Sequence, residues 1–60
     1  MKNKETILAS MQASADYILN MVEDIENGAV EDVPGTLENM SLMFANDYKE
    51  FAAYWKKLEE

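Results

Sequence analysis

The fold is decided by the segment Asn27-Gly28-Ala29-Val30-Glu31-Asp32-Val33-Pro34-Gly35-Thr36, which separates two longer stretches with helical spacing of apolar residues. Asn27-Gly28 indicates the end of a first helix, because glycine adopts the left-handed conformation that closes a helix C-terminus. Pro34-Gly35 suits the middle of a type II turn, which makes Thr36 the N-cap of a second helix. Asp32 as N-cap, with Pro34 in the first turn, is the alternative. Either start leaves a connection of about four to eight residues.

Before this segment, apolar residues recur at alternating spacings of three and four. They form a stripe of Leu8, Met11, Ala15, Ile18, Val22, Ile25 and Ala29, which is widened by Ile7, Leu19 and Met21. This pattern is typical of an amphipathic helix whose stripe packs on a neighbouring helix. The sequence therefore predicts a first helix over about residues 4–27.

After the segment, a second helix is predicted over about residues 36–58, and its apolar residues fit two registers. One register contains Leu37, Met40, Phe44, Asp47, Phe51, Tyr54 and Leu58. The other contains Leu37, Ser41, Phe44, Tyr48, Phe51, Trp55 and Leu58. We prefer the second register, because an unpaired buried carboxylate at Asp47 would cost several kcal/mol.

A short link between helices of similar length favours an antiparallel hairpin, here a single all-α domain over residues 1–60 with its turn at about 28–35. Residues whose numbers sum to about 64 would then face each other. This pairing places small residues of the first helix, Ala9, Ser10, Ala13, Ser14 and Ala15, opposite the aromatic residues of the second. Two helices of this size bury little apolar area. We therefore expect a homodimer that forms an antiparallel four-helix bundle.

The composition argues against an enzyme, a cofactor site and a metal site. The chain contains no His, no Cys and no Arg, which removes the common proton shuttle, the strongest side-chain nucleophile and the bidentate anion clamp. An EF-hand alignment on Gly28 places Ile25 and Pro34 where calcium ligands are required. We predict no catalytic, cofactor-binding or metal-binding residues.

Charge and cysteine usage restrict the surroundings of the protein. The absence of Cys excludes a disulfide scaffold, and the apolar run Ile7-Leu8-Ala9 is too short for a signal peptide or a membrane span. The net charge of -7 argues against direct binding to nucleic acid or an anionic membrane. These features predict a cytoplasmic protein, in the host cytoplasm if a phage encodes it.

Acidic residues gather around the predicted turn. Between Glu5 and Tyr48 the chain has nine acidic residues and no basic residue, and its five lysines lie toward the two ends. The candidate partner-binding residues are Glu23, Asp24, Glu26, Glu31, Asp32 and Glu38, with Asp16 and Asp47 as outlying contributors. Three of the six lie in the last turns of the first helix, where the helix dipole disfavours anions. A solvated acidic surface that only keeps the protein in solution is the simpler explanation.

We hypothesise that the protein binds and inhibits a nucleic-acid-binding protein by presenting carboxylates in place of phosphates to its basic cleft. In size and charge alone, the chain is similar to small acidic phage-encoded inhibitors of restriction or CRISPR systems. The alternative is a helical regulatory or assembly adaptor that binds its partner through an apolar and aromatic helix face. The residues considered for that face are Met40, Leu42, Met43, Tyr48 and Trp55.

Overall fold

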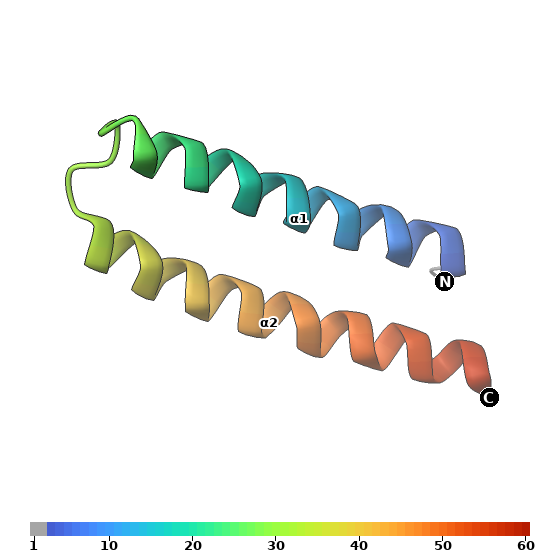
Figure 1. Cartoon of the computed structure of the whole chain (residues 1–60). Helices are drawn as coiled ribbons and strands as arrows, with labels where there is room; N and C mark the ends of the chain where they lie inside the picture. The colour runs from blue at the N-terminus through green and yellow to red at the C-terminus, as the bar shows by residue number, and fades with distance from the viewer. Residues whose placement is uncertain (1–2) are drawn as a thin grey trace.

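The chain folds into two α-helices that lie side by side and run in opposite directions (Figure 1). The computed structural model describes residues 3–60, in which α1 spans Lys4–Glu26 and α2 spans Val33–Glu59. The predicted all-α helical hairpin is confirmed. The hairpin measures 45 × 18 × 12 Å, and its radius of gyration of 14.1 Å exceeds the ~10 Å of a compact domain of this length. The molecule is therefore a layer only one helix thick.

The first helix begins at a side-chain cap. The Asn3 Oδ1 atom accepts a hydrogen bond from the Thr6 backbone N–H at 2.8 Å and another from the Thr6 hydroxyl at 2.9 Å. This arrangement satisfies one of the N–H groups that have no partner inside the helix. Glu5 in the first turn also interacts favourably with the helix dipole. Local interactions are therefore sufficient to place the start of α1.

The first helix ends in a Schellman motif at Gly28. The Ala29 N–H donates to the Asp24 carbonyl at 2.8 Å, and the Gly28 N–H donates to the Ile25 carbonyl at 3.1 Å. Gly28 has a φ of 72°, so the predicted left-handed glycine at this helix end is confirmed. The chain turns away from the axis of α1 at this residue.

Gly28→Ala should destabilise the hairpin by ~1 kcal/mol, because a Cβ atom is strained at positive φ. Nothing lies within 4 Å of the position that this Cβ would occupy, so the cost is conformational and not a clash. Gly28→Asn should recover part of the loss, since asparagine tolerates the left-handed region. Urea unfolding followed by circular dichroism measures both effects. An alanine variant as stable as the natural protein would contradict this explanation.

The second helix begins three residues earlier than predicted, at Val33 instead of Thr36. Asp32 is the N-cap: its Oδ1 atom accepts a hydrogen bond from the Gly35 N–H at 3.1 Å. Pro34 fits the first turn, where its fixed φ is helical and its missing N–H would have had no partner. The preferred prediction of Thr36 as N-cap is therefore wrong, and the alternative start at Asp32 is correct.

The side of α1 that contacts α2 is rotated away from the predicted stripe. The least exposed side chains of α1 are Ile7, Ser10, Ser14, Met21 and Ile25. In the predicted stripe, by contrast, Leu8, Ile18 and Val22 are 46%, 38% and 45% exposed. The centre of the predicted stripe is therefore not the contact side, although its member Ile25 and the flanking Ile7 and Met21 do lie at the contact. The small side chains of Ser10 and Ser14 leave room between the helices for the large rings of α2.

The second helix uses the register that contains Asp47, so the preference for the other register is wrong. The half-buried side chains in its middle are Met40, Phe44, Asp47, Phe51 and Tyr54. Tyr48 remains 47% exposed, and Ser41 is exposed as well. Asp47 shares a shallow cavity with Ser14 and is only half-buried, so its carboxylate does not lose all contact with water. The large cost that argued against this register is therefore not incurred.

The earlier start of α2 also changes which residues face each other. Tyr17 of α1 contacts Phe44 of α2 edge to face, with 5.9 Å between ring centroids. The residue numbers of this pair sum to 61, in place of the predicted value of about 64. The difference matches the start of α2, which lies three residues earlier than predicted.

Asp47→Leu should stabilise the hairpin, because leucine would fill apolar space that the carboxylate leaves between the helices. The cavity beside Asp47 has a volume of about 230 Å³ and is lined partly by Tyr17, Met43 and Phe44. Burying one additional aliphatic side chain contributes ~1 to 2 kcal/mol. Thermal unfolding should show a higher midpoint than in the matched Asp47→Asn variant, which removes the charge alone. Equal midpoints for the two variants would mean that charge, and not packing, sets the cost at this position.

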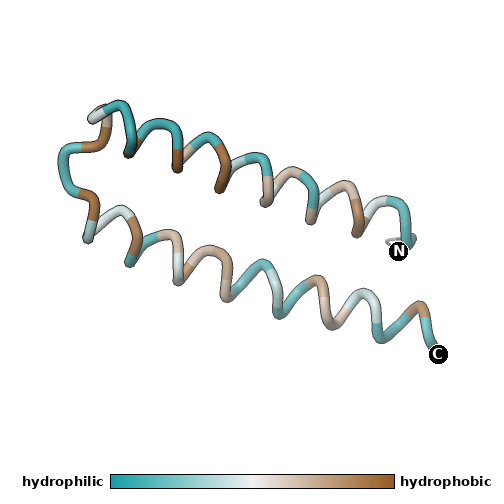
Figure 2. Tube along the Cα trace, in the orientation of Figure 1, coloured by the Kyte–Doolittle hydropathy of each residue, from teal (hydrophilic) through white to brown (hydrophobic). Residues whose placement is uncertain are grey.

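Polar and apolar residues are interspersed along both helices (Figure 2). Among the residues that the structure describes, Ile7 is the one large side chain that is fully buried, with 1% of its surface exposed. Over residues 3–60, neither helix has an apolar stretch of the length needed to cross a lipid bilayer. The two helices therefore share a thin core and leave much of their apolar surface uncovered.

Candidate functional site

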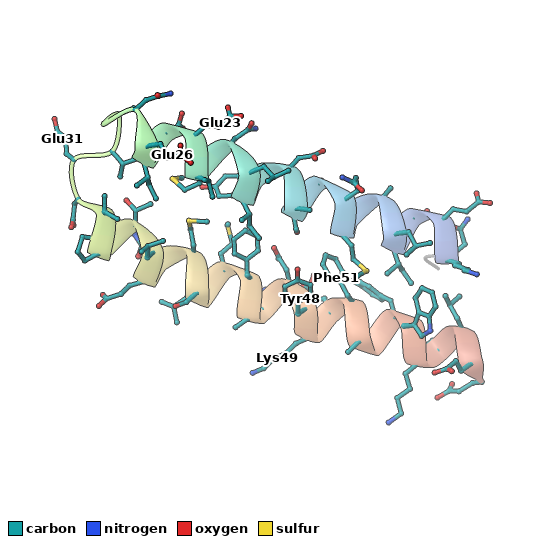
Figure 3. The ribbon with its side chains drawn as sticks, viewed as in Figure 1. Glu23, Glu26, Glu31, Tyr48, Lys49 and Phe51 are labelled. Carbon is teal, nitrogen blue, oxygen red and sulfur yellow. The ribbon has the colours of Figure 1, made fainter. Side chains whose placement is uncertain are left out.

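The hairpin brings the six predicted partner-binding carboxylates to one end of the molecule, which we call the acidic end. Its members are Glu23, Asp24, Glu26, Glu31, Asp32 and Glu38, and all are exposed. Two elements and the turn between them contribute side chains, since Glu23 belongs to α1, Glu31 to the turn and Glu38 to α2. Figure 3 shows Glu23 and Glu31 pointing outward from this end. The acidic end is thus a rounded end of the molecule with exposed carboxylates on several sides.

Asp32 has a structural role within this group. Its carboxylate caps α2 through the Gly35 N–H. A Cβ atom at residue 35 would collide with this carboxylate, so glycine is the residue that lets Asp32 lie over the helix N-terminus. Loss of an N-cap aspartate costs ~1 kcal/mol, so a substitution here changes stability as well as charge. Glu23, Glu26, Glu31 and Glu38 are better positions for testing binding.

The charge of the molecule is unevenly distributed along its length. Residues 15–46, which form the half nearer the turn, contain seven acidic residues and no basic residue. The remaining 28 residues contain five lysines and five acidic residues. The last turn of α1 also has no basic side chain to balance the negative end of the helix dipole. The acidic end is therefore the strongest source of negative potential on the hairpin.

Within residues 3–60, no group of three or more acidic side chains is close enough together to hold a metal ion. The carboxylates of the acidic end point in different directions and do not converge on one point. Such an arrangement favours several separate contacts with a positively charged surface over coordination of a single ion.

The structure also reveals a second surface, which we call the apolar face. It consists of Leu8, Met11, Ala15, Ile18 and Val22 from α1 and Leu37, Tyr48, Ala52 and Trp55 from α2. Most of these residues come one position after a residue at the helix contact, as Leu8 follows Ile7 and Tyr48 follows Asp47. In two antiparallel helices, such a step of one residue turns the side chains of both helices toward the same side of the layer. None of the nine residues is charged. The apolar face therefore runs along one side of the hairpin, and on α2 the exposed Ser41 lies between Leu37 and Tyr48.

A groove runs along the apolar face near the open end of the hairpin. It has a volume of about 390 Å³ and is lined by Leu8, Met11, Tyr48, Phe51, Ala52 and Trp55. The rings of Tyr48 and Phe51 meet edge to face with centroids 5.6 Å apart, and Figure 3 shows both rings on the side of α2 that faces α1. Lys49 points away from this groove (Figure 3).

Sequence reasoning assigned most of the apolar face to the interior of the hairpin. The signal for it was present, because these residues are members of the predicted α1 stripe together with Leu37, Tyr48 and Trp55 of the α2 register preferred from the sequence. The proposed adaptor surface is divided by the structure. Tyr48 and Trp55 lie on the apolar face, Met40 and Met43 line a cavity with Tyr17, and Leu42 is 72% exposed outside both.

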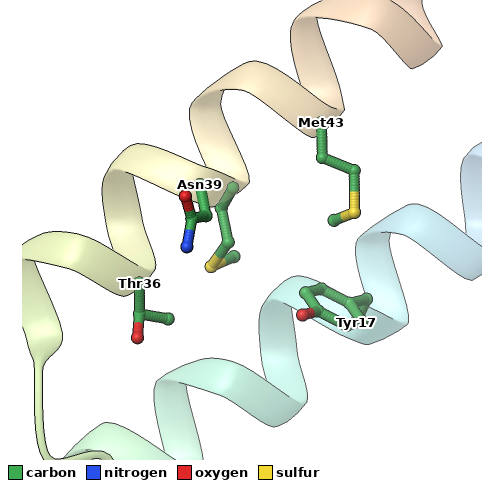
Figure 4. Close-up of a pocket in the computed structure, with 5 residues that line it drawn as sticks. Tyr17, Thr36, Asn39 and Met43 are labelled. Carbon is green, nitrogen blue, oxygen red and sulfur yellow. The ribbon is translucent and has the colours of Figure 1, made fainter.

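The other side of the hairpin has a smaller and more polar cavity (Figure 4). It has a volume of about 170 Å³ and is lined by Tyr17, Thr36, Asn39, Met40 and Met43. The close-up shows side chains of α2 on one side of the space and Tyr17 of α1 on the other. Hydroxyl, amide and thioether groups in this arrangement can form hydrogen bonds, but they do not pair a nucleophile with a base.

Comparisons of the chain with protein-family models, with curated proteins and with solved structures found no match. The assignment of function therefore rests on the acidic end and the apolar face.

Proposed function

We propose that this chain is a non-enzymatic protein-binding module that acts as a homodimer of helical hairpins. The acidic end binds the basic surface of a nucleic-acid-binding protein and blocks it, with carboxylates in the place of phosphates. The apolar face holds two hairpins together as a four-helix bundle. The contact is with the protein itself and not with nucleic acid, because the acidic half of the chain repels phosphate.

One observation carries the proposal: the half of the molecule nearer the turn contains seven acidic residues and no basic residue. Its carboxylates at the acidic end are all exposed. They are held on two helix ends and a short turn, so little conformational freedom is lost when they meet a partner. A surface that only keeps the protein in solution needs charge, but it does not require that one half of the molecule contain no lysine.

The physical consequence is an association that depends strongly on salt. A concentrated negative potential accelerates encounter with a positive cleft, and this acceleration decreases as salt screens the charges. Charge–charge contacts at the rim of an interface affect the association rate more than the dissociation rate. We therefore expect fast binding at low salt and much weaker binding above ~0.5 M salt, where the screening length is only a few ångströms.

The experiment uses the heparin-binding fraction of a cell extract, which concentrates nucleic-acid-binding proteins. The immobilised protein should retain a component of this fraction and release it when a DNA or RNA oligonucleotide is added. The fraction that does not bind heparin is the control and should lose nothing to the column. A retained protein that is released neither by nucleic acid nor by about 0.5 M salt, at which exposed charges are largely screened, would contradict the proposal.

A second function is favoured by the groove beside Trp55. An adaptor would bind an amphipathic helix of its partner there, with apolar residues of that helix filling the space lined by Met11, Tyr48 and Trp55. Such binding should survive high salt, because burial of apolar surface is not weakened by screening. Salt dependence of the retained protein therefore separates the two functions.

A further inference from the structure

The hairpin exposes more surface than a folded monomer of its mass should. Its accessible surface is 4829 Å², whereas a monomer of 6.9 kDa is expected to expose ~4,000 Å². The excess of about 800 Å² is close to what one partner buries in a stable interface of standard size. The apolar face supplies uncharged surface of the kind that such an interface covers.

The position of the apolar face along the hairpin suits a second copy of the same chain. On α1 it extends from Leu8 to Val22, and its middle is Ala15. On α2 it extends from Leu37 to Trp55, and its middle is residue 46. Residues 15 and 46 lie at the same position along the long axis of the hairpin, because the numbers of facing residues sum to 61, as in the Tyr17–Phe44 pair. A two-fold axis that crosses both helices at this position brings the apolar face of a second copy onto the apolar face of the first, as a symmetric dimer requires.

Charge decides how the two copies are oriented. In a parallel dimer the two halves with seven acidic residues and no basic residue would lie against each other. In an antiparallel dimer each of these halves lies against the half that contains Lys4, Lys49, Lys56 and Lys57. Like charges brought together weaken association, and opposite charges along the rim select the orientation.

We propose that two hairpins pack through their apolar faces in antiparallel orientation, with the two-fold axis beside Ala15. This inference deepens the proposed function and rests on its dimer. Each α1 then packs on α1 of the second copy, and each α2 packs on α2 of the second copy. Leu37 of one copy reaches the groove beside Trp55 of the other. The small side chain of Ala15 allows the two α1 helices to approach closely at the centre.

This arrangement makes the dimer bivalent. The two acidic ends lie at opposite ends of a bundle about as long as one hairpin, whose longest dimension is 45 Å. The apolar face stops at Val22 and Leu37, so the outward-pointing carboxylates of each acidic end, such as Glu23 and Glu31, stay exposed although the open end of the second copy lies beside them. One dimer can therefore bind two basic surfaces that face opposite directions, with one partner molecule at each end.

Engineered disulfides test the orientation, and the chain has no cysteine of its own to interfere. In the antiparallel dimer, Ala15→Cys lies next to its own symmetry copy and should form a disulfide under mild oxidation. A mixture of the single variants Ser41→Cys and Ala52→Cys should also cross-link, because these positions lie on either side of the axis on α2. Both reactions should be at least about tenfold faster than that of the outward-facing Leu42→Cys, since a dimer raises the local thiol concentration.

A parallel dimer gives a different result. It would place α1 of one copy on α2 of the other, so a mixture of Leu8→Cys and Ala52→Cys would cross-link and Ala15→Cys would not. That outcome overturns the proposed orientation, and a natural chain that sediments as a monomer overturns the dimer. Circular dichroism of Ala15→Ser shows whether a polar substitution at residue 15 is tolerated, and the pair at residues 41 and 52 does not depend on it. None of these measurements uses a basic partner, so their failure is distinguishable from failure of the acidic end to bind.

Discussion

Ile18→Lys is expected to abolish the folded state of the protein at micromolar concentration. Ile18 lies near the middle of the apolar face and is 38% exposed in the single hairpin, so most of the effect of lysine there falls on the proposed dimer contact. In the proposed dimer, however, the ammonium group would be covered by the second copy without a partner. An uncompensated charge at such a position costs ~3 kcal/mol or more, which weakens dimerisation about a hundredfold or more.

Loss of the dimer should unfold the chain, because the hairpin by itself has little that holds it together. Among the described residues, Ile7 is its one fully buried large side chain. The apolar area that two isolated helices bury roughly balances the conformational entropy lost on folding. We therefore expect the natural protein to show a melting temperature that rises with concentration, and Ile18→Lys to lose most of its helical signal.

Leu42→Lys is the matched control. It introduces the same charge into a helix, at a leucine that is 72% exposed and lies outside the apolar face. Circular dichroism and sedimentation equilibrium should show this variant to be as helical and as dimeric as the natural protein. Equal behaviour of Ile18→Lys and Leu42→Lys would show that the apolar face does not hold the molecule together.

Neutralising four glutamates of the acidic end should strongly weaken partner binding while the hairpin becomes more stable. The variant combines Glu23→Gln, Glu26→Gln, Glu31→Gln and Glu38→Gln and leaves the cap residue Asp32 unchanged. Removing this concentration of charge should slow association with a basic protein by about 10- to 1,000-fold at low salt. Surface plasmon resonance against the component eluted by nucleic acid measures this effect.

The gain in stability follows from the position of two of these residues. Glu23 and Glu26 lie in the last turns of α1, where no basic residue is present and the helix dipole disfavours negative charge. Each such charge costs ~0.3 to 1 kcal/mol, so glutamine should raise the unfolding midpoint. A variant that binds less and is also less stable would indicate structural damage and not loss of a binding surface.

The open end of the hairpin provides a control with the same change in net charge. Glu5→Gln, Glu50→Gln, Glu59→Gln and Glu60→Gln together also remove four negative charges from a chain whose net charge is -7. All four side chains are exposed, and none belongs to the acidic end. This variant should bind the basic partner nearly as well as the natural protein. If both variants lose binding equally, net charge matters and the position of the carboxylates does not.

The two helices, the approximate place of the turn and the group of acidic residues beside it could be predicted from the amino-acid sequence. These features depend on neighbours within a few residues. Gly28 supplies a backbone conformation that other residues adopt only under strain. The three and four spacing of apolar residues is likewise a property of one helix. A hairpin then brings residues 23–38 together whatever the angle at which its helices meet.

The side of each helix that faces the other could not be predicted from the sequence, because it depends on how the two helices pack. Both helices have apolar residues over a wider arc than one neighbour can cover, so periodicity alone does not choose between the alternatives. Ser10 and Ser14 lie at the contact, in agreement with the prediction that small residues face the aromatic rings. Asp47 lies there as well, because close approach of the helices and the fit of the rings outweigh the polarity of a carboxylate that is only half-buried. The more apolar stripe of α1 was thereby left on the surface, where a second chain can cover it.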